Sequence, residues 1–323
     1  MDTSKMEWQE RERKFYSNPR IFFVLSIMLY FFWAFAIPFT KLGYAAFHIG
    51  ETDVPEILIW GGIRLFFGGL VVLIMGAFKG HKVLPSSKTG WHNLLKLSLI
   101  MSVLQYTFLN IGTAKSPGVV ASILISSGSF IGVLLSGVVF KEDKLTIRKL
   151  LGCTLGLIAV IILNIQNLHT VITVSVSGSL FIIAAQFSGN LGAIYLKIIS
   201  QGKNAVYIGA AQTCIGGAVL ILLGFLFGGC LPAENLSDAL FPVIGVICVT
   251  AFGLMISNQL YKYNDISKVV IFSLLQPVFG TVISAVMLGE PLASLPLLLS
   301  LGLNSAGVAL ATIEKNEDAQ KTV

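Results

Sequence analysis

Ten long apolar runs divide this chain, and each is long enough to cross a lipid bilayer as a helix. About 20 apolar residues span the roughly 30 Å of bilayer hydrocarbon. A chain in lipid must pair its own backbone groups, so such runs are predicted to be α-helices, whereas barrel strands would show shorter, alternating patterns. The sequence therefore predicts an all-α membrane protein with ten transmembrane helices. The predicted helices cover residues 20–41, 55–78, 93–113, 117–140, 147–164, 174–198, 205–228, 239–261, 266–289 and 292–313.

The charged residues are few and lie mostly between these runs. Only 12% of the residues are charged and 55% are hydrophobic, whereas a soluble domain has about 25% charged residues. The connections are too short for a soluble catalytic or nucleotide-binding domain. The first apolar run is too long for a signal peptide, so we expect it to be a retained span. The expected divisions are a cytoplasmic segment at 1–19, membrane units at 20–164 and 174–313, and a cytoplasmic tail at 314–323.

The basic residues predict the orientation of these helices. With ten crossings, both termini and every second loop lie on the same side of the membrane. Of the 22 lysines and arginines, all but Lys41, Arg64, Lys96 and Lys115 fall on that side or at its helix ends. Cytoplasmic loops are enriched in Lys and Arg, so both termini are expected in the cytoplasm and the chain in a cell membrane, the inner or plasma membrane of a bacterium. The net charge of +6 then reflects topology, and no nucleic-acid partner is expected.

The two halves of the chain share a repeated pattern. The segment Ser126–Gly132 leads through an apolar run to Glu142, and the segment Leu274–Gly280 leads through a similar run to Glu290. The same offset aligns both glycines and both acids, so we interpret the chain as two units of five spans. Because five is odd, the second unit must be inverted relative to the first. Inverted repeats are typical of secondary transporters, whose substrate site lies near the bilayer midplane between the repeats.

This organisation resembles the EamA-type transporters of the drug/metabolite transporter superfamily. The shared features are the five-plus-five helices, the sequence from Trp33 to Lys41, an arginine inside the second span, and acids after the fourth and ninth spans. The likeness is greatest at 266–290, and the first half departs from it with Ser129 where the second half has Pro277. The resemblance implies transport of small metabolites by alternating access. It leaves the substrate open among amino acids, sugars, nucleotide sugars and drugs.

Arg64 is the one ionisable residue that lies well inside a predicted span. A charge at this depth is costly, so by default it indicates function. A guanidinium group facing a cavity would suit a substrate carboxylate or phosphate, which it pairs with two parallel hydrogen bonds. The alternative is a structural role, in which Arg64 caps helix-terminal carbonyls or joins the two repeats. Both interpretations stay open from the sequence.

Uncharged polar residues gather in the third, fourth, sixth, eighth and ninth predicted spans. Several are four residues apart and so share a helix face, as Tyr106 and Asn110 do. Together they favour a central polar cavity with aromatic walls, although Ser, Asn and Gln also join membrane helices to one another. The predicted substrate-binding residues are Tyr30, Trp33, Arg64, Gln105, Tyr106, Asn110, Ser126, Ser129, Gln186, Asn190, Asn258, Gln259, Ser273 and Gln276.

Five further residues are predicted to shape the helices or their packing. Pro277 removes one backbone hydrogen bond and is expected to kink the ninth span. Gly132 and Gly280, aligned by the repeat, are predicted to let helices cross closely. Gly152 and Gly156 form a G-x-x-x-G pattern that suits helix packing within the chain or between two copies. The chain is therefore expected to be a monomer or a homodimer.

Acids are missing from the middle of the predicted spans, and no metal-site pattern is present. None of the 16 Asp and Glu residues falls in the middle of a span, and the four His lie in loops or at helix edges. The four cysteines show no metal-site spacing. No phosphate-binding loop or catalytic motif is present. We therefore predict no catalytic residues, no metal and no cofactor, and coupling through a membrane-embedded acid is not expected.

These observations together favour a carrier for a small solute. The expected function is transport of an amino acid, another small anionic or amphipathic solute, or a drug, by alternating access and in the direction of export. The expected partners are this small molecule and the lipid bilayer. The alternative is a channel or a lipid scramblase without a carrier cycle. Either would be expected to have a continuous polar stripe or a lipid-facing groove.

Overall fold

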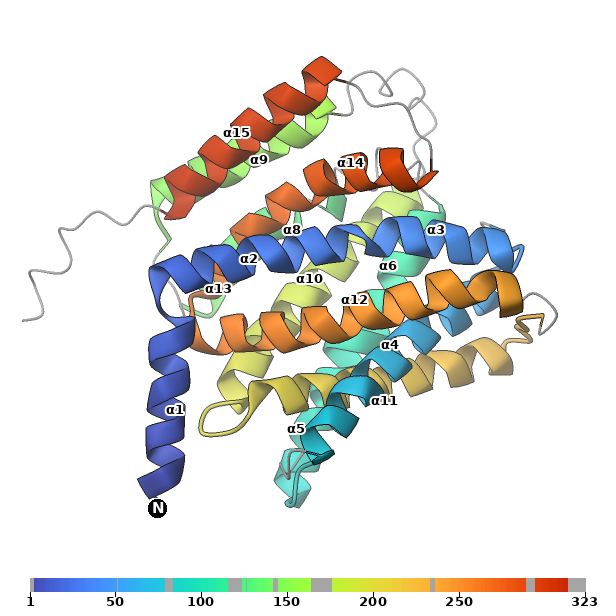
Figure 1. Ribbon diagram of the computed structural model, residues 1–323, viewed down its shortest axis with the longest axis horizontal. Helices are drawn as coiled ribbons and strands as arrows, with labels where there is room; N and C mark the ends of the chain where they lie inside the picture. Colours follow the sequence, from blue (N-terminus) through green and yellow to red (C-terminus); the bar gives the residue numbers. More distant parts are fainter. Residues whose placement is uncertain are drawn as a thin grey trace, which may run out of the picture.

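Helices make up nearly all of the described chain in the computed structural model (Figure 1). The structure describes residues 3–50, 52–78, 84–115, 124–125, 127–141, 145–163, 176–232, 236–288 and 294–312. These residues contain no strand, so the all-α prediction is confirmed for them. In the first half the helices are α1 (Thr3–Tyr16), α2 (Pro19–Ala34), α3 (Ala36–Ala46), α4 (Val54–Phe78), α5 (Lys88–Ser98), η1 (Leu99–Leu104), α6 (Gln105–Ala114), α8 (Gly128–Leu134), η2 (Leu135–Val139) and α9 (Ile147–Leu163). In the second half they are α10 (Val176–Ile199), α11 (Ala205–Leu226), α12 (Leu236–Tyr263), α13 (Ile266–Ile271), η5 (Phe272–Leu275), α14 (Gln276–Leu288) and α15 (Ser294–Thr312).

Six of the described helical stretches are long and apolar enough to cross a membrane. They are Pro19–Ala46, Val54–Phe78, Lys88–Ala114, Val176–Ile199, Ala205–Leu226 and Ser237–Tyr263. Shorter apolar helices cover Gly128–Val139, Ile266–Gly280 and Gly302–Ala311. The chain is therefore a multi-pass helical membrane protein by length and composition, and the count of ten crossings stays a prediction.

The helix starts follow local capping chemistry. The side chain of Asn18 accepts hydrogen bonds from the backbone N–H groups of Arg20 and Ile21, at 3.0 and 3.4 Å. Pro19 occupies the first turn of α2, where its missing N–H costs nothing. Asn204 caps α11 in the same way, accepting from Val206 and Tyr207. Such caps fix where α2 and α11 begin.

Glycines set the distance between two helix pairs. Helices α4 and α11 lie side by side and form the most extensively packed pair, followed by α9 and α15 (Figure 1). A methyl group added to Gly62 of α4 would lie 2.8 Å from the carbonyl oxygen of Gly217 on α11. One added to Gly152 of α9 would lie 2.5 Å from the carbonyl oxygen of Gly307 on α15. The backbones therefore touch at these crossings, as small residues permit in membrane helices.

The predicted G-x-x-x-G face is used within the chain. Gly152 contacts α15, and a methyl group on Gly156 would meet the side chain of Leu274 in η5. Both glycines are buried. This face therefore joins α9 to α15 and η5. Of the two roles that the sequence left open, packing within the chain and packing between two copies, the structure shows the first.

Irregular turns interrupt two helices. The π-helical segment η1 separates α5 from α6, and the hydroxyl of Ser188 on α10 donates to the carbonyl oxygen of Ile100 within it at 2.6 Å. The tighter 3₁₀ segment η5 comes directly before α14, in which Pro277 is the second residue. This break lies where Pro277 was expected to disturb the ninth span, since proline cannot donate a backbone hydrogen bond. π-Segments occur often at functional sites, and no pattern in the sequence had indicated η1.

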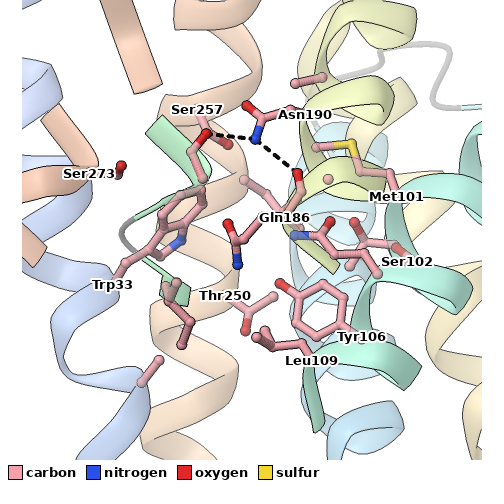
Figure 2. A pocket seen from close by; sticks show the side chains of 18 of the residues that line it. Trp33, Met101, Ser102, Tyr106, Leu109, Gln186, Asn190, Thr250, Ser257 and Ser273 are labelled. Carbon is pink, nitrogen blue, oxygen red and sulfur yellow. Dashed lines mark hydrogen bonds between the residues drawn. The ribbon is translucent and has the colours of Figure 1, made fainter. Parts of the chain in front are cut away.

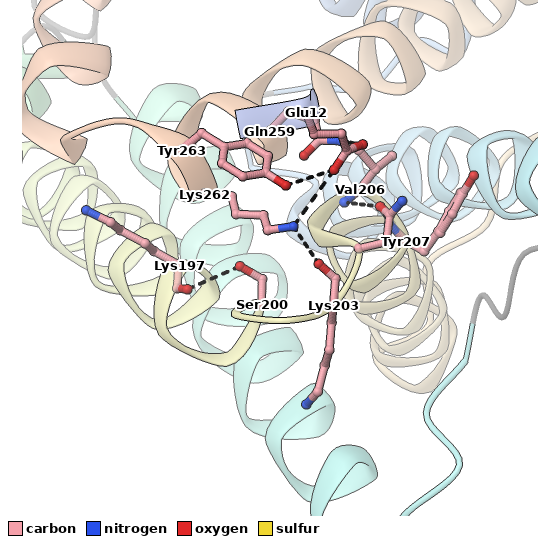
Figure 3. Close-up of polar contacts among 10 residues, drawn as sticks. Glu12, Lys197, Ser200, Lys203, Val206, Tyr207, Gln259, Lys262 and Tyr263 are labelled. Carbon is pink, nitrogen blue, oxygen red and sulfur yellow. Dashed lines mark hydrogen bonds and ion pairs between the residues drawn. The ribbon is translucent and has the colours of Figure 1, made fainter. Parts of the chain in front are cut away.

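Helix α1 lies across the end of the bundle at which α2 begins and α12 ends (Figure 1). Its Glu12 carboxylate accepts a hydrogen bond from the Tyr263 hydroxyl at 2.8 Å and another from the Gln259 amide at 3.0 Å (Figure 3). The Lys262 ammonium lies 4.0 Å from Glu12 and donates to the carbonyl oxygen of Lys203 at 2.7 Å. One carboxylate thus holds α1 against the end of α12.

Other contacts strengthen the same junction. The Tyr16 and Tyr263 rings stack with centroids 5.9 Å apart, and the amide of Asn264 donates to the Tyr16 carbonyl. The hydroxyl of Ser17 donates to the carbonyl of Tyr263 at 3.2 Å. Burial, and then the negative charge of Glu12, raise the pKa of Tyr16 above its usual value. Tyr16 therefore stays neutral over the physiological pH range.

We expect Glu12→Ala to loosen this junction and destabilise the protein by about 2–3 kcal/mol, because hydrogen bonds to charged groups are worth about 1.5–3 kcal/mol. The side chain of Glu12 is 16% exposed, and its loss removes the negative charge that lies 4.0 Å from the buried Lys262 ammonium. Thermal unfolding of the detergent-solubilised protein measures the loss.

Glu10→Ala is the matched control on the same helix. The Glu10 side chain is 65% exposed and forms an ion pair with Lys14 one turn away. Exposed pairs of this kind contribute little, so the midpoint of unfolding is expected to stay close to that of the wild type. Equal shifts for the two variants would show that Glu12 does not hold α1 in place.

Candidate functional site

A cavity of about 210 Å³ lies among the helices of both halves. Its lining from the first half comes from α2 and α3, α4, η1 and α6, and α8 with the residues before it. Its lining from the second half comes from α10, α11, α12 and the broken helix α13–η5–α14. The lining residues are Tyr30, Trp33, Ala36, Arg64, Leu65, Met101, Ser102, Gln105, Tyr106, Leu109, Ile125, Gly128, Gln186, Gly189, Asn190, Ala193, Gln212, Thr213, Thr250, Leu254, Ser257, Tyr261, Val270, Ser273, Gln276 and Pro277.

Many of the sequence-predicted site residues meet at this cavity. Figure 2 shows Trp33 on one side, Ser102 and Tyr106 on the other, and the Gln186 and Asn190 side chains between them. The predicted residues that line the cavity are Tyr30, Trp33, Arg64, Gln105, Tyr106, Gln186, Asn190, Ser273, Gln276 and Pro277. The structure therefore brings together residues that are far apart in the sequence, and their contact with a substrate stays a prediction.

Other predicted site residues lie away from the cavity lining. The Gln259 amide binds Glu12 of α1, and the Asn258 amide donates to the Leu254 carbonyl of its own helix at 2.7 Å. Ser129 is fully buried and Asn110 is partly buried, but neither is among the lining residues. Ser126 lies outside the described residues. For Gln259 and Asn258, the turn of α12 about its axis directs the side chains into helix contacts.

Five amide side chains pack against glycines of neighbouring helices, which the sequence had not indicated. An added methyl group on Gly61 would meet Asn110, one on Gly128 would meet Gln186, and one on Gly132 would meet Asn190. The same holds for Gly189 with Gln105 and for Gly209 with Asn258. Each amide therefore occupies the space that a glycine on a neighbouring helix leaves open. Three of these amides, those of Gln105, Gln186 and Asn190, also line the cavity, whereas Asn110 and Asn258 are not among its lining residues.

The aligned glycines differ from one another in the structure. Gly132 of α8 packs closely against two helices, since its methyl group would lie 2.9 Å from the Val270 side chain of α13 and against the Asn190 amide of α10. No described atom lies within 4 Å of the corresponding position at Gly280. A close contact is thus described at Gly132, and none is described at Gly280, which is itself buried. The shared role of the two glycines stays a prediction.

Asn190 fixes the local backbone beside the cavity. Its amide nitrogen donates to the carbonyl oxygens of Gly128 at 3.0 Å and Gln186 at 2.9 Å (Figure 2). The first bond joins α10 to the start of α8, where a carbonyl lies next to the cavity. Asn190 is 8% exposed, so this connection is shielded from competing water.

A second polar chain completes the wall and was not predicted from the sequence. The Ser102 hydroxyl donates to the Gln212 side-chain oxygen at 2.8 Å, and the Gln212 amide donates to the Thr213 hydroxyl at 2.8 Å. Thr213 in turn donates to the Gly209 carbonyl. The sequence does indicate Gln212 as a candidate, because it is an amide side chain inside the apolar run 205–228. The other lining residues that were missed, such as Thr250 and Ser257, resemble ordinary helix-packing residues in sequence.

Arg64 is the only charged side chain among the described residues that line the cavity. Its guanidinium carbon lies 5.3 Å from the centre of the Tyr106 ring, a distance typical of a cation–π contact. Its Nε is buried and makes no hydrogen bond within the described part of the chain. No Asp or Glu lines the described wall. The described lining therefore carries one positive charge and no negative charge.

The described residues contain no group of three or more His, Cys, Asp or Glu that could hold a metal ion. The cavity lining offers amides, hydroxyls, aromatic rings and one guanidinium group. These groups suit reversible recognition of a small polar molecule, which is what a carrier requires.

Comparison with known proteins places the fold and the family. A protein of Bacillus subtilis (strain 168) named "Uncharacterized transporter YvbV" is 26% identical over 268 residues, which cover 82% of this chain and 84% of that protein. A "Probable amino-acid metabolite efflux pump" of Salmonella typhimurium (strain LT2) is 25% identical over 271 residues, covering 79% and 85%. A crystal structure with a TM-score of 0.71 and 18% identity covers 90% of this chain and 94% of its own, which shows a shared fold.

The family comparison matches both halves of the chain. The model of the EamA-like transporter family matches residues 20–165 and again residues 176–313. The family and the names of the relatives indicate a membrane transporter rather than an enzyme. Since these two matches together cover most of the sequence, the chain belongs to the EamA-like transporter family.

Proposed function

We propose that the protein is a carrier that moves a small metabolite out of the cell by alternating access through the central cavity. Its ten helices form two inverted repeats of five, at 20–164 and 174–313. The observation that supports this most directly is the cavity wall, which takes polar side chains from both repeats. A site between repeats can be exposed to either side when one repeat moves against the other.

The helix contacts support the inverted repeat. In the proposed alignment, α4 and α11 are the second helices of their repeats, and α9 and α15 are the fifth. These two pairs are also the two most extensively packed pairs in the described structure. Contact between counterpart helices is expected when a pseudo-twofold axis relates the repeats. The touching backbones at Gly62 and Gly217 would lie close to that axis.

The proposed orientation places both termini in the cytoplasm of a cell whose plasma membrane holds the protein. Helix α1 contains Arg11, Arg13 and Lys14, which agrees with the enrichment of basic residues on the cytoplasmic side. The cavity is smaller than the roughly 300–1,000 Å³ of drug-sized pockets, which favours a small metabolite over a bulky drug. The efflux activity named for the Salmonella relative supports export.

Filling the cavity should stop transport without unfolding the protein. Ser273 lies on the cavity wall beside Pro277 and is partly exposed, so Ser273→Trp is expected to reduce counterflow by at least about tenfold, the equivalent of 1.4 kcal/mol. Proteoliposomes are tested with radiolabelled leucine, phenylalanine, 4-methylpentanoate, 3-phenylpropionate, uridine monophosphate and tetraphenylphosphonium. Counterflow, in which solute on one side accelerates flux from the other, distinguishes a carrier from a channel or scramblase.

Val286→Trp provides the matched control. Val286 is in α14 and is 79% exposed on the outside of the helix bundle, so a tryptophan there faces lipid. Its counterflow is expected to equal that of the wild type, and both variants should elute as single species in detergent. Equal flux through the two tryptophan variants would contradict transport through this cavity.

A further inference from the structure

We propose that the cavity selects small solutes with net negative charge, carboxylates that lack an ammonium group, over zwitterionic amino acids and organic cations. This inference rests on the carrier function proposed above and specifies the substrate class of the same site. It differs from what the name of the Salmonella relative suggests, because an ordinary amino acid has no net charge.

The charge of the lining is the first support. Arg64 contributes a permanent positive charge, and no acidic side chain of the described wall neutralises it. The surrounding α4 residues, Trp60 and Leu65 among them, are almost fully buried. An unpaired charge in such surroundings is costly and is stabilised by an ion of opposite sign. A solute anion would supply that partner each time it binds.

An excess of donors beside Arg64 is the second support. The buried Arg64 Nε, Trp60 Nε1 and Asn110 Nδ2 make no hydrogen bonds within the described residues. Trp60 is one turn before Arg64 on α4, and Asn110 packs against Gly61 on the same helix. All three atoms are donors, and a buried donor without an acceptor costs free energy. Of these three residues only Arg64 lines the cavity. A carboxylate in the cavity presents only acceptors, so its chemistry complements the Arg64 guanidinium group.

The aromatic groups of the cavity offer an ammonium ion little in exchange for its lost hydration. The ring of Tyr106 already faces the Arg64 guanidinium, so a second cation on it would meet a like charge. The Tyr30 and Trp33 rings pack edge to face with centroids 5.4 Å apart, and the side-chain oxygen of Gln212 already accepts from Ser102. The ammonium group of an amino acid would therefore lose its hydration without gaining a negatively charged partner among the described lining residues.

Two sets of solutes that differ only in their charged groups test this selectivity. The sets are 4-methylpentanoate, leucine and 3-methylbutylamine, and 3-phenylpropionate, phenylalanine and 2-phenylethylamine. Binding of radiolabelled probes to the purified full-length protein is measured at neutral pH in wild type, Arg64→Gln, Arg64→Lys and Lys41→Gln. Lys41→Gln removes the same charge from an exposed residue outside the cavity lining.

We expect the wild type to bind each carboxylate at least about tenfold more tightly than the matching amino acid, with the amine weakest. Arg64→Gln should abolish this order. Arg64→Lys should keep the order with weaker binding, because lysine retains the charge but not the planar pair of donors. Lys41→Gln should match the wild type. Flux of the carboxylate, but not of the amino acid, should also generate a membrane potential in proteoliposomes.

Several results would overturn the inference. Leucine or phenylalanine binding as tightly as its deaminated analogue would do so, as would an unchanged order in Arg64→Gln or no carboxylate binding at all. Thermal unfolding checks that Arg64→Gln is folded. If Arg64→Gln does not fold, the comparison of Arg64→Lys with the wild type tests the role of Arg64. If amino acids show counterflow that Ser273→Trp blocks, the carrier function stands and only the charge selectivity fails.

Discussion

Replacing Gly217 by leucine is expected to prevent stable folding, with a loss of more than about 4 kcal/mol, a size that marks disruption of a core. A methyl group on Gly217 would lie 2.7 Å from the Gly62 carbonyl oxygen and against the backbone nitrogen of Phe66. Neither atom belongs to a side chain that can rotate away. The helices α4 and α11 would have to separate, and they are the most extensively packed pair in the described structure.

The measurement is the yield of monodisperse protein after extraction in mild detergent, followed by thermal unfolding of whatever is recovered. Gly217→Ala should be intermediate, because overpacking by one carbon costs about 1–3 kcal/mol. Gly302→Leu is the control, since no described atom lies within 4 Å of the position of its side chain and Gly302 is exposed on α15. Normal yield and stability for Gly217→Leu would mean that α4 and α11 do not touch in the folded protein.

The positions of the helices could be predicted from the sequence because the bilayer interior offers no hydrogen-bond partners to any span. Each apolar run had to pair its own backbone groups, so its length and composition indicated a helix. The described helices α4, α11 and α12 overlap the predicted runs 55–78, 205–228 and 239–261 with differences of a few residues. The irregular segment η1 escaped prediction because its partner, the Ser188 hydroxyl, comes from a helix far along the chain.

The composition of the candidate site could be predicted in part, because polarity inside a span is visible in the sequence but helix rotation is not. Arg64 and Gln186 line the cavity as expected. Gln259 has the same chemistry as Gln186, yet it binds Glu12 on α1, a segment that the sequence treated only as a cytoplasmic extension. The partners of an amide depend on which helix faces it. That information lies in the packing of several segments and not in the span itself.

The contacts of glycines, like those of amides, could not be predicted from the sequence of one span, and the aligned pair Gly132 and Gly280 provides a test. The repeat aligns Gly132 with Gly280, and the sequence predicted one role for both. In the structure only Gly132 lies against a neighbouring side chain among the described residues, because α8 meets the Asn190 amide of α10 there. Repeats that diverge in sequence can thus keep a glycine at both positions while only one of them makes the close contact.

Gly132→Ala is therefore expected to destabilise the protein by about 1–3 kcal/mol and to reduce transport at least about tenfold, a change equivalent to 1.4 kcal/mol in barrier height. The added methyl group would displace the Asn190 amide, whose hydrogen bonds to the Gly128 and Gln186 carbonyls hold the cavity wall. Thermal unfolding and counterflow of 3-phenylpropionate and phenylalanine measure the two effects.

Gly280→Ala makes the same chemical change at the position that the repeat aligns with Gly132. Gly280 is buried, but no described atom lies within 4 Å of the new methyl group, and alanine also favours the helix over glycine by up to about 1 kcal/mol. Gly280→Ala should therefore be neutral or slightly stabilising, with normal transport. If the two alanine variants behaved alike, the contact between Gly132 and Asn190 would not determine the shape of the cavity, and sequence repetition alone would describe both glycines.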